Sequence, residues 1–224
     1  MHGLLYTGTS GFSYASWRGG FYPAGAAPDE LLRHYARRLR SVELLATYHR
    51  LPSEQQLGRW AAQTPPEFRF ALRLSRRIVD GDLAAFATFV ERARALGERL
   101  GVLVARLPDG RPRDDGLLRF LLGSLEPGLR FCLDPRDPSW EDAGVDALLA
   151  EAGAVRVNDL AAAAPFRYLR LRDTPYEEAA LASIAGEVRP LHERGIDVYA
   201  FVRHEDAPHG PLAAERLAAL VEAG

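Results

Sequence analysis

The stretch GVLVARLPDGRPRDDGLLRFLLGSLEPGLRFCLD, residues 101–134, contains two predicted strands and the helix between them. Gly101–Leu107 is a short run rich in apolar and β-branched residues, which is typical of a buried strand, and a proline ends it. Asp114–Ser124 has the pattern of a helix, a Pro-Gly turn follows it, and Leu129–Asp134 is again strand-like. A strand, a helix and a strand in this order predict neighbouring parallel strands.

The same alternation continues through the rest of the chain. Further strands are predicted at Leu4–Thr9, Ser41–Thr47, Phe68–Ser75, Val155–Asn158, Phe166–Arg172 and Asp197–His204. Further helices are predicted at Asp29–Arg40, Ser53–Gln63, Leu83–Glu98, Ala143–Ala152, Tyr176–Glu193 and Pro211–Ala223. The segment Leu160–Ala164, between the sixth and seventh strands, is too short for a full helix.

Eight strands in alternation with helices predict an α/β fold, a (β/α)8 barrel of the TIM type, with one short or missing helix after strand six. Because no linker or low-complexity segment interrupts the pattern, we expect one barrel domain over residues 1–224. An open doubly wound sheet is the alternative, and it normally carries a glycine-rich turn that opens a helix after the first strand. Here Gly8–Gly11 leads into Phe12, Tyr14 and Trp17 instead, which favours the barrel.

Composition excludes several classes of function. All 28 basic residues are arginine, so lysine Schiff-base chemistry and a Walker A phosphate loop are excluded. The single cysteine, Cys132, excludes an intramolecular disulfide and a cysteine-based zinc cluster. A net charge of −2 argues against bulk binding to nucleic acid or anionic lipid. With no long apolar run and no secretory signal, we expect a cytoplasmic protein with no membrane partner.

Short blocks of the sequence match a known pattern in both order and spacing. They are Gly8–Tyr14, Trp17, Phe21–Pro23, Val42-Glu43, Thr47–Pro52, Trp60, Pro65–Phe70, Arg136–Trp140 and Tyr168–Leu171. Together they resemble the family called domain of unknown function 72 (YecE-like), from Leu4 to the C-terminal helix. The resemblance implies a barrel of this type and no established activity.

This chain departs from the family pattern at several polar positions. The family usually has Asn, Lys, Gln, Glu and His at the positions occupied here by Leu45, Arg73, Arg106, Asp134 and Asp137, and Asn-Asn-Asp where Arg203-His204-Glu205 stands. An altered or lost family chemistry is therefore one interpretation of this member.

Alternation along the strands predicts which side chains enter the barrel. On the third strand, Phe68, Phe70, Leu72 and Leu74 share one face, and Arg69, Ala71 and Arg73 share the other. Because the apolar face must meet the helices, the arginines are expected to point inward. The same argument turns inward Glu43 with Leu45, Arg106 with Val104, Cys132 with Asp134, Arg156 with Asn158, and Tyr168 with Arg170 and Arg172. The eighth strand is ambiguous.

Arginines then outnumber the inward carboxylates, Glu43 and Asp134. A buried guanidinium needs a partner, so the surplus predicts a site for an anionic small molecule, a phosphate or a carboxylate held by two parallel hydrogen bonds. Candidate binding residues are Arg73, Arg106, Arg136, Arg170, Arg172, Asn158 and His204. A structural polar core, or strands whose inward face is assigned wrongly, are the alternatives.

Aromatic residues in the loops after the strands offer a second set of binding candidates. Tyr14, Trp17 and Trp140 are predicted to form a wall for a sugar or a base, and Tyr48 follows the second strand. Packing of Trp140 over the end of the barrel is the alternative. No HxH or HExxH spacing is present, so no metal site is predicted, and the sequence indicates no particular cofactor.

The first functional hypothesis is a hydrolase or another acid/base enzyme that acts on a phosphorylated or carboxylated small molecule. Glu43 and Asp134 would be the catalytic pair, although nearby arginines lower carboxyl pKa values and disfavour a carboxyl general acid. A barrel that binds the anion without turnover is one alternative. A nucleic-acid-processing protein with Arg50, Arg76 and Arg77 on its rim is another, which the net charge disfavours. Neither the substrate nor the oligomeric state is indicated.

Overall fold

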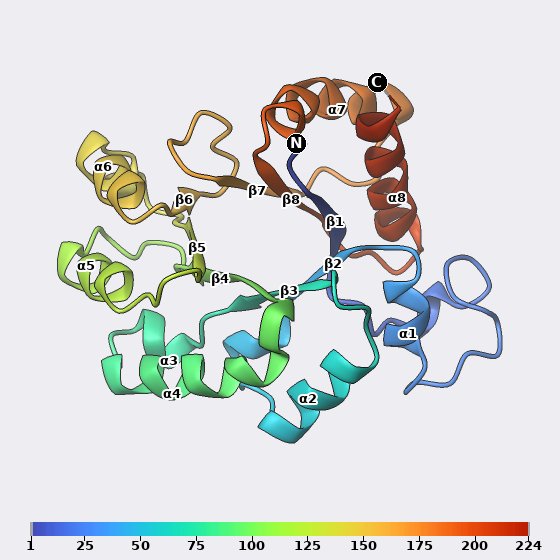
Figure 1. Cartoon of the computed structure of the whole chain (residues 1–224), viewed down its shortest axis with the longest axis horizontal. Coiled ribbons are helices and arrows are strands. Elements are labelled where there is room, and N and C mark those ends of the chain that lie inside the picture. The colour runs from blue at the N-terminus through green and yellow to red at the C-terminus, as the bar shows by residue number, and fades with distance from the viewer. Residues whose placement is uncertain (1, 224) are drawn as a thin grey trace.

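The computed structural model describes residues 2–223 and confirms the barrel. Its strands are β1 (Leu5–Ser10), β2 (Ser41–Leu44), β3 (Arg69–Arg73), β4 (Leu100–Arg106), β5 (Arg130–Asp134), β6 (Val155–Arg156), β7 (Phe166–Leu171) and β8 (Asp197–Val202). All pairings are parallel, in the order β6-β5-β4-β3-β2-β1-β8-β7, so the sheet curls into a nearly closed ring (Figure 1). The carboxyl ends of all eight strands therefore face the same way.

Helices surround this ring (Figure 1). They are α1 (Leu31–Ala36), α2 (Glu54–Ala62), α3 (Arg76–Val79), α4 (Leu83–Ala93), α5 (Asp115–Gly123), α6 (Ala143–Glu151), α7 (Glu178–Glu193) and α8 (His209–Glu222). Ser53 and Asp114 begin α2 and α5 by accepting a hydrogen bond from a backbone N–H of the first turn. No helix lies between β6 and β7 in the described chain, as the short Leu160–Ala164 segment predicted.

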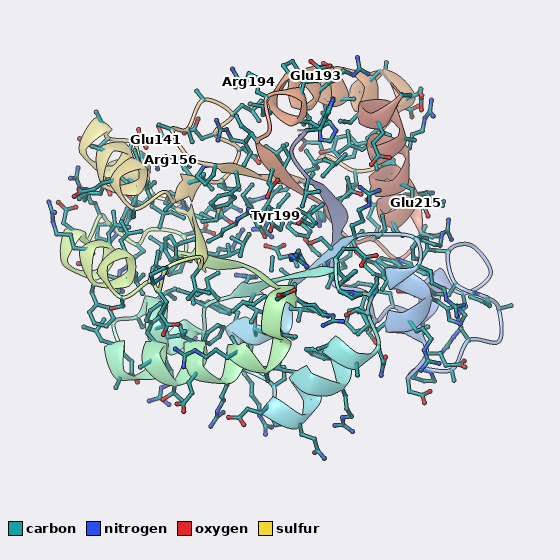
Figure 2. The ribbon with its side chains drawn as sticks, viewed as in Figure 1. Glu141, Arg156, Glu193, Arg194, Tyr199 and Glu215 are labelled. Carbon is teal, nitrogen blue, oxygen red and sulfur yellow. The ribbon has the colours of Figure 1, made fainter. Side chains whose placement is uncertain are left out.

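Two apolar layers hold the barrel together. The outward faces of the strands pack against the helices, with Phe70, Leu72, Leu103, Leu133 and Val198 among the buried residues. The inward faces form a separate core of Tyr6, Ala71, Val102, Val104, Cys132, Val155, Phe166, Tyr168, Tyr199 and Phe201. Figure 2 shows Tyr199 in the middle of the ring. This core confirms the alternation predicted for β3, β4, β5 and β7, and β8 turns Tyr199 and Phe201 inward. On β2, Glu43 points inward as predicted, since it accepts a hydrogen bond from the inward Tyr168.

The inward face predicted for the sixth strand is wrong. Val155 belongs to the inner core, whereas Arg156 turns outward and binds the Asp146 carboxylate on α6, at 2.6 Å from Nη2 (Figure 2). The strand is only two residues long, so the pattern was too short to fix its phase. The second strand is also shorter than predicted, because the chain enters a 3₁₀ helix (Leu45–Tyr48) after Leu44.

Asn158 spans the gap between β6 and β7. Its backbone N–H donates to the Tyr168 carbonyl at 2.9 Å, and its side-chain Oδ1 accepts the Arg170 N–H at 2.7 Å. Its left-handed backbone (φ 60°) turns the chain at the end of β6, a conformation that asparagine tolerates better than most residues. A side-chain amide thus replaces part of the missing strand pairing.

Among the described residues, no helix is both long enough and apolar enough to cross a membrane.

Candidate functional site

A pocket of about 330 Å³ opens at the carboxyl ends of the strands. Its lining is dominated by arginine: Arg73, Arg106, Arg136, Arg170, Arg172 and Arg203, with Ser10, Leu45, Leu171, Phe201 and His204. Five of these arginines come from the binding set that the sequence predicts, and they reach the pocket from the ends of β3 and β4, from β7 and the residue after it, and from the loop after β5. We call this space the arginine pocket.

Asp134, the last residue of β5, organises three of the arginines. Its carboxylate accepts from Arg170 Nη1 at 2.6 Å, Arg172 Nη2 at 3.1 Å and Arg106 Nη1 at 3.2 Å. Burial alone raises the pKa of Asp134, but the charges of the three arginines outweigh burial and lower it. The group therefore remains a carboxylate at neutral pH and acts as an anchor, which disfavours its predicted role as a proton donor.

Glu43 on β2 is completely buried and is held by three neighbours. Its Oε2 accepts from the Ser10 hydroxyl at 2.9 Å and lies 3.3 Å from Arg170 Nη2, and its Oε1 accepts from the Tyr168 hydroxyl at 3.1 Å. Arg170 therefore lies between the two inward carboxylates and bridges them. Ser10 also lines the arginine pocket, so its hydroxyl connects Glu43 to the open space.

Arg73, at the end of β3, has no carboxylate partner among the described residues. Its Nε is buried and makes no hydrogen bond, and its guanidinium lies over the Tyr48 ring, 4.8 Å from the centroid. Thr47 fixes this neighbour, because its hydroxyl donates to the Leu44 and Arg73 carbonyls and ties the 3₁₀ helix to β3. Burial lowers the pKa of Arg73 from its ordinary value, since water is removed from its charge.

Positive charge exceeds negative charge around the arginine pocket. Six guanidinium groups line the pocket, and three carboxylates among the described residues lie close to them: the buried Glu43 and Asp134, and the exposed Asp109, which lies 3.9 Å from Arg136. Arg172 Nε, like Arg73 Nε, is buried without an acceptor among residues 2–223. Buried N–H groups without acceptors are rare and costly in folded proteins. The pocket therefore carries unmatched positive charge, and two of its arginines each keep one buried N–H without an acceptor in the described chain.

Tyr14 and His204 form one wall of this region. Gly11 has a left-handed backbone (φ 89°), and a Cβ there would lie 2.5 Å from the Tyr14 hydroxyl, so glycine lets the loop fold back. The Tyr14 hydroxyl donates to the Ser10 carbonyl at 2.9 Å, and its ring stacks on His204 at 4.7 Å. His204 Nδ1 is buried without a partner among the described residues.

Three other candidate binding residues, Trp17, Trp140 and Asn158, are bonded within the fold and do not line the arginine pocket. Trp17 and Trp140 are 0% and 1% exposed, and their indole N–H groups donate to the Glu205 and Arg111 carbonyls. Neither indole therefore offers a free face to a ligand, and the predicted three-ring wall is reduced to Tyr14. Asn158 bonds to β7 and does not line the pocket.

The charged rim predicted for nucleic-acid binding is partly neutralised. Arg76 and Arg77 lie in α3, where they pair with Asp80 at 3.3 Å and with Asp82 at 2.5 Å. These pairs leave less free positive charge beside the arginine pocket than the sequence alone indicated.

Two features of the site escaped sequence reasoning. One is the pairing of the Tyr168 hydroxyl and the Ser10 hydroxyl with Glu43, which depends on three different strands. The other is a groove outside the barrel beside Trp60, which depends on how α1 and α2 pack. Neither the pairing nor the groove leaves a local pattern in the sequence.

Comparison with known proteins assigns the chain to a family. Residues 6–224 match the family model described as "Protein of unknown function DUF72". A DUF72 family protein from Thermotoga maritima is similar over 98% of this chain and 99% of its own, with a TM-score of 0.80 and 21% identity. One from Enterococcus faecalis covers 98% and 96%, with a TM-score of 0.80 and 14% identity. Among curated proteins, none matches.

Proposed function

We propose that this chain, which belongs to the DUF72 family, binds an anionic small molecule through a phosphate or carboxylate group in the arginine pocket. The observation that carries the proposal is the excess of guanidinium charge: six arginines line the pocket, and among the described residues three carboxylates, Glu43, Asp134 and Asp109, lie within ion-pair distance of any of them. Arginine presents several donors in a rigid plane that matches the oxygens of such a group. Asp134 would hold Arg106, Arg170 and Arg172 in place before the ligand arrives.

Thermal unfolding in the presence of inorganic phosphate tests this binding. Ligand binding to the folded state raises stability by mass action, so we expect the melting temperature to rise with phosphate concentration. Arg73→Gln should abolish most of the rise. Arg69→Gln is the matched control, because Arg69 lies on the same strand and face but at the opposite end of the barrel, away from the arginine pocket. Sodium chloride at equal ionic strength controls for screening.

An equal rise in chloride would contradict the proposal, and so would an equal response of the two arginine variants. Either result would mean that phosphate acts on the protein generally. The melting temperatures of both variants without phosphate show whether each still folds.

Hydrolysis of the bound anion is a second candidate function. It is favoured by the 2.9 Å hydrogen bond between Ser10 Oγ and Glu43 Oε2, with Ser10 on the pocket wall. Glu43 would accept the proton of the Ser10 hydroxyl as Ser10 Oγ attacks the phosphorus or carbonyl carbon, and the arginines would stabilise the charge that develops. The leaving group would depart with its electron pair, and water would then release the acid from Ser10.

Hydrolysis of 4-nitrophenyl phosphate tests this second function. Glu43→Gln and Ser10→Ala should each lose turnover while phosphate still raises the melting temperature. Turnover that survives in both variants would assign the activity to other residues or to a contaminant. No turnover in the native chain would leave the anion-binding barrel without this activity.

A further inference from the structure

A second hollow of about 770 Å³ lies beside the arginine pocket, between α1, α2 and the loop after β1. We call it the side groove. Three aromatic side chains line it, Phe12, Tyr14 and Trp60, with Leu32, Leu44 and Leu45. Polar residues also line it: Ser13, Asp29, Gln56, Arg59 and Gln63. Apolar walls with a few polar groups are the usual composition of a small-molecule site.

The side groove and the arginine pocket adjoin each other at three points. Leu45 lines both spaces, and Ser10 and Gly11, consecutive in the chain, line one each. Tyr14 lines the side groove, while His204, which lines the arginine pocket, stacks on its ring at 4.7 Å. The Tyr14–His204 pair is thus the common wall of the two spaces. A molecule held by its anionic group in the arginine pocket would extend past this wall into the side groove.

Trp60 gives the side groove its recognition chemistry. It lies on α2, partly exposed, and is supported by Phe70 (stacked, 6.4 Å) and Phe12 (edge-on, 6.1 Å). An aromatic ring braced on two sides loses little freedom when a flat ligand ring packs against it. Gln56 on the same helix and Gln63, the residue after its end, offer amide donors and acceptors to substituents on such a ring.

We propose that the ligand of this barrel is an aromatic phosphate or carboxylate whose ring occupies the side groove against Trp60. The inference rests on the proposed anion site and adds the class of molecule that carries the anion. The arginine pocket supplies the charge recognition. The side groove supplies the affinity that separates this ligand from inorganic phosphate.

The three tryptophans of the chain make the inference testable by fluorescence. Trp17 and Trp140 are buried and line neither space, although Trp17 packs against Tyr14 with its ring centre 4.7 Å away. Trp60 is therefore the tryptophan that a ligand in the side groove would touch directly. Phenyl phosphate should change the tryptophan emission in a saturable way, whereas inorganic phosphate should leave it nearly unchanged. Calorimetry should show that phenyl phosphate binds about tenfold more tightly than inorganic phosphate.

Trp60→Leu should remove this tenfold preference and leave inorganic phosphate binding unchanged. Gln55→Ala is the matched control, since Gln55 is exposed on the same helix and does not line the groove. Equal binding of the two probes by the native chain would overturn the inference while leaving the anion site in place. A hexose phosphate that binds more tightly than phenyl phosphate would overturn the aromatic class. Failure of both probes would contradict the anion site itself.

Discussion

The two ends of the barrel use the same residue type in opposite ways. Arg69 and Arg73 begin and end β3, four residues apart on the same inward face. Arg69 Nη1 donates to the Pro66 and Phe68 carbonyls at 2.8 and 3.0 Å. Arg73 has a buried Nε without an acceptor among the described residues and no carboxylate partner there. One strand thus carries a satisfied arginine at its amino end and an unsatisfied one at its carboxyl end.

The fifth strand shows the same contrast. Arg130, at its amino end, donates to the Asp197 carboxylate at 2.5 Å and to the Tyr199 hydroxyl at 3.0 Å. Asp134, at its carboxyl end, is shared by three arginines that have few other acceptors. The two amino-end arginines therefore find their partners within the chain, as on a stability face, whereas the carboxyl end carries more arginine than carboxylate. This difference separates a structural arginine from one available to a ligand.

Removal of the Asp134 charge should produce the largest effect. Asp134→Asn leaves three guanidinium groups together without their carboxylate, and we expect a loss of about 3 kcal/mol or more in the free energy of unfolding. Asp197→Asn, at the other end, should cost about 1–2 kcal/mol, because one arginine loses its partner there. Urea denaturation of both variants measures the difference. Equal losses would contradict the contrast between the two ends.

Replacement of single arginines should change stability in opposite directions. Arg130→Met removes two satisfied hydrogen bonds and should cost about 1–2 kcal/mol. Arg73→Met removes a partly buried charge that has no carboxylate partner among the described residues, and should raise stability by about 0.5–1 kcal/mol, since its contact with Tyr48 offsets part of the burial cost. Both values are measured by urea denaturation in a buffer free of phosphate and sulfate. Loss of stability in Arg73→Met would mean that Arg73 is structural.

The pH dependence of the free energy of unfolding in acid should show the smallest effect. The arginines lower the pKa of Asp134 against the opposing effect of burial, so its folded pKa lies below the unfolded value of about 3.9. Such a group stabilises the fold above the unfolded pKa, and this contribution is lost as pH falls through the folded pKa. The stability difference between the native chain and Asp134→Asn should therefore be constant near neutral pH and decrease below about pH 4. A difference that grows in acid would contradict the lowered pKa.

Most of the fold was predictable because long periodic segments carry it. The period-two pattern of Phe68–Leu74 predicts that Arg69 and Arg73 point into the barrel, and the structure agrees, since the apolar residues between them pack outward against the helices. The phase of β6 was not predictable, because a strand of two residues has no period. The eighth strand was ambiguous for a different reason, since both of its faces are apolar and buried.

The charges of the candidate site could be predicted from the sequence, but the contacts between its residues could not. Surplus arginine can be counted in the sequence, but the bridging of both carboxylates by Arg170 depends on how β2, β5 and β7 are placed around the barrel. The burial of Trp17 and Trp140 depends on carbonyls that lie 188 and 29 residues away. Contacts of this range leave no local pattern, so the sequence does not distinguish a buried structural tryptophan in a loop from one that binds a ligand.

The gap between β6 and β7 has a consequence for how the protein opens. A fully closed barrel has no edge strand, whereas here both β6 and β7 are edges that meet through the amide of Asn158. The Asn158 link between β6 and β7 replaces a full strand pairing, so local opening of the sheet should begin there. Backbone amides on either side of the Asn158 link would then exchange with deuterated solvent before those of β1, which has a paired strand on each side.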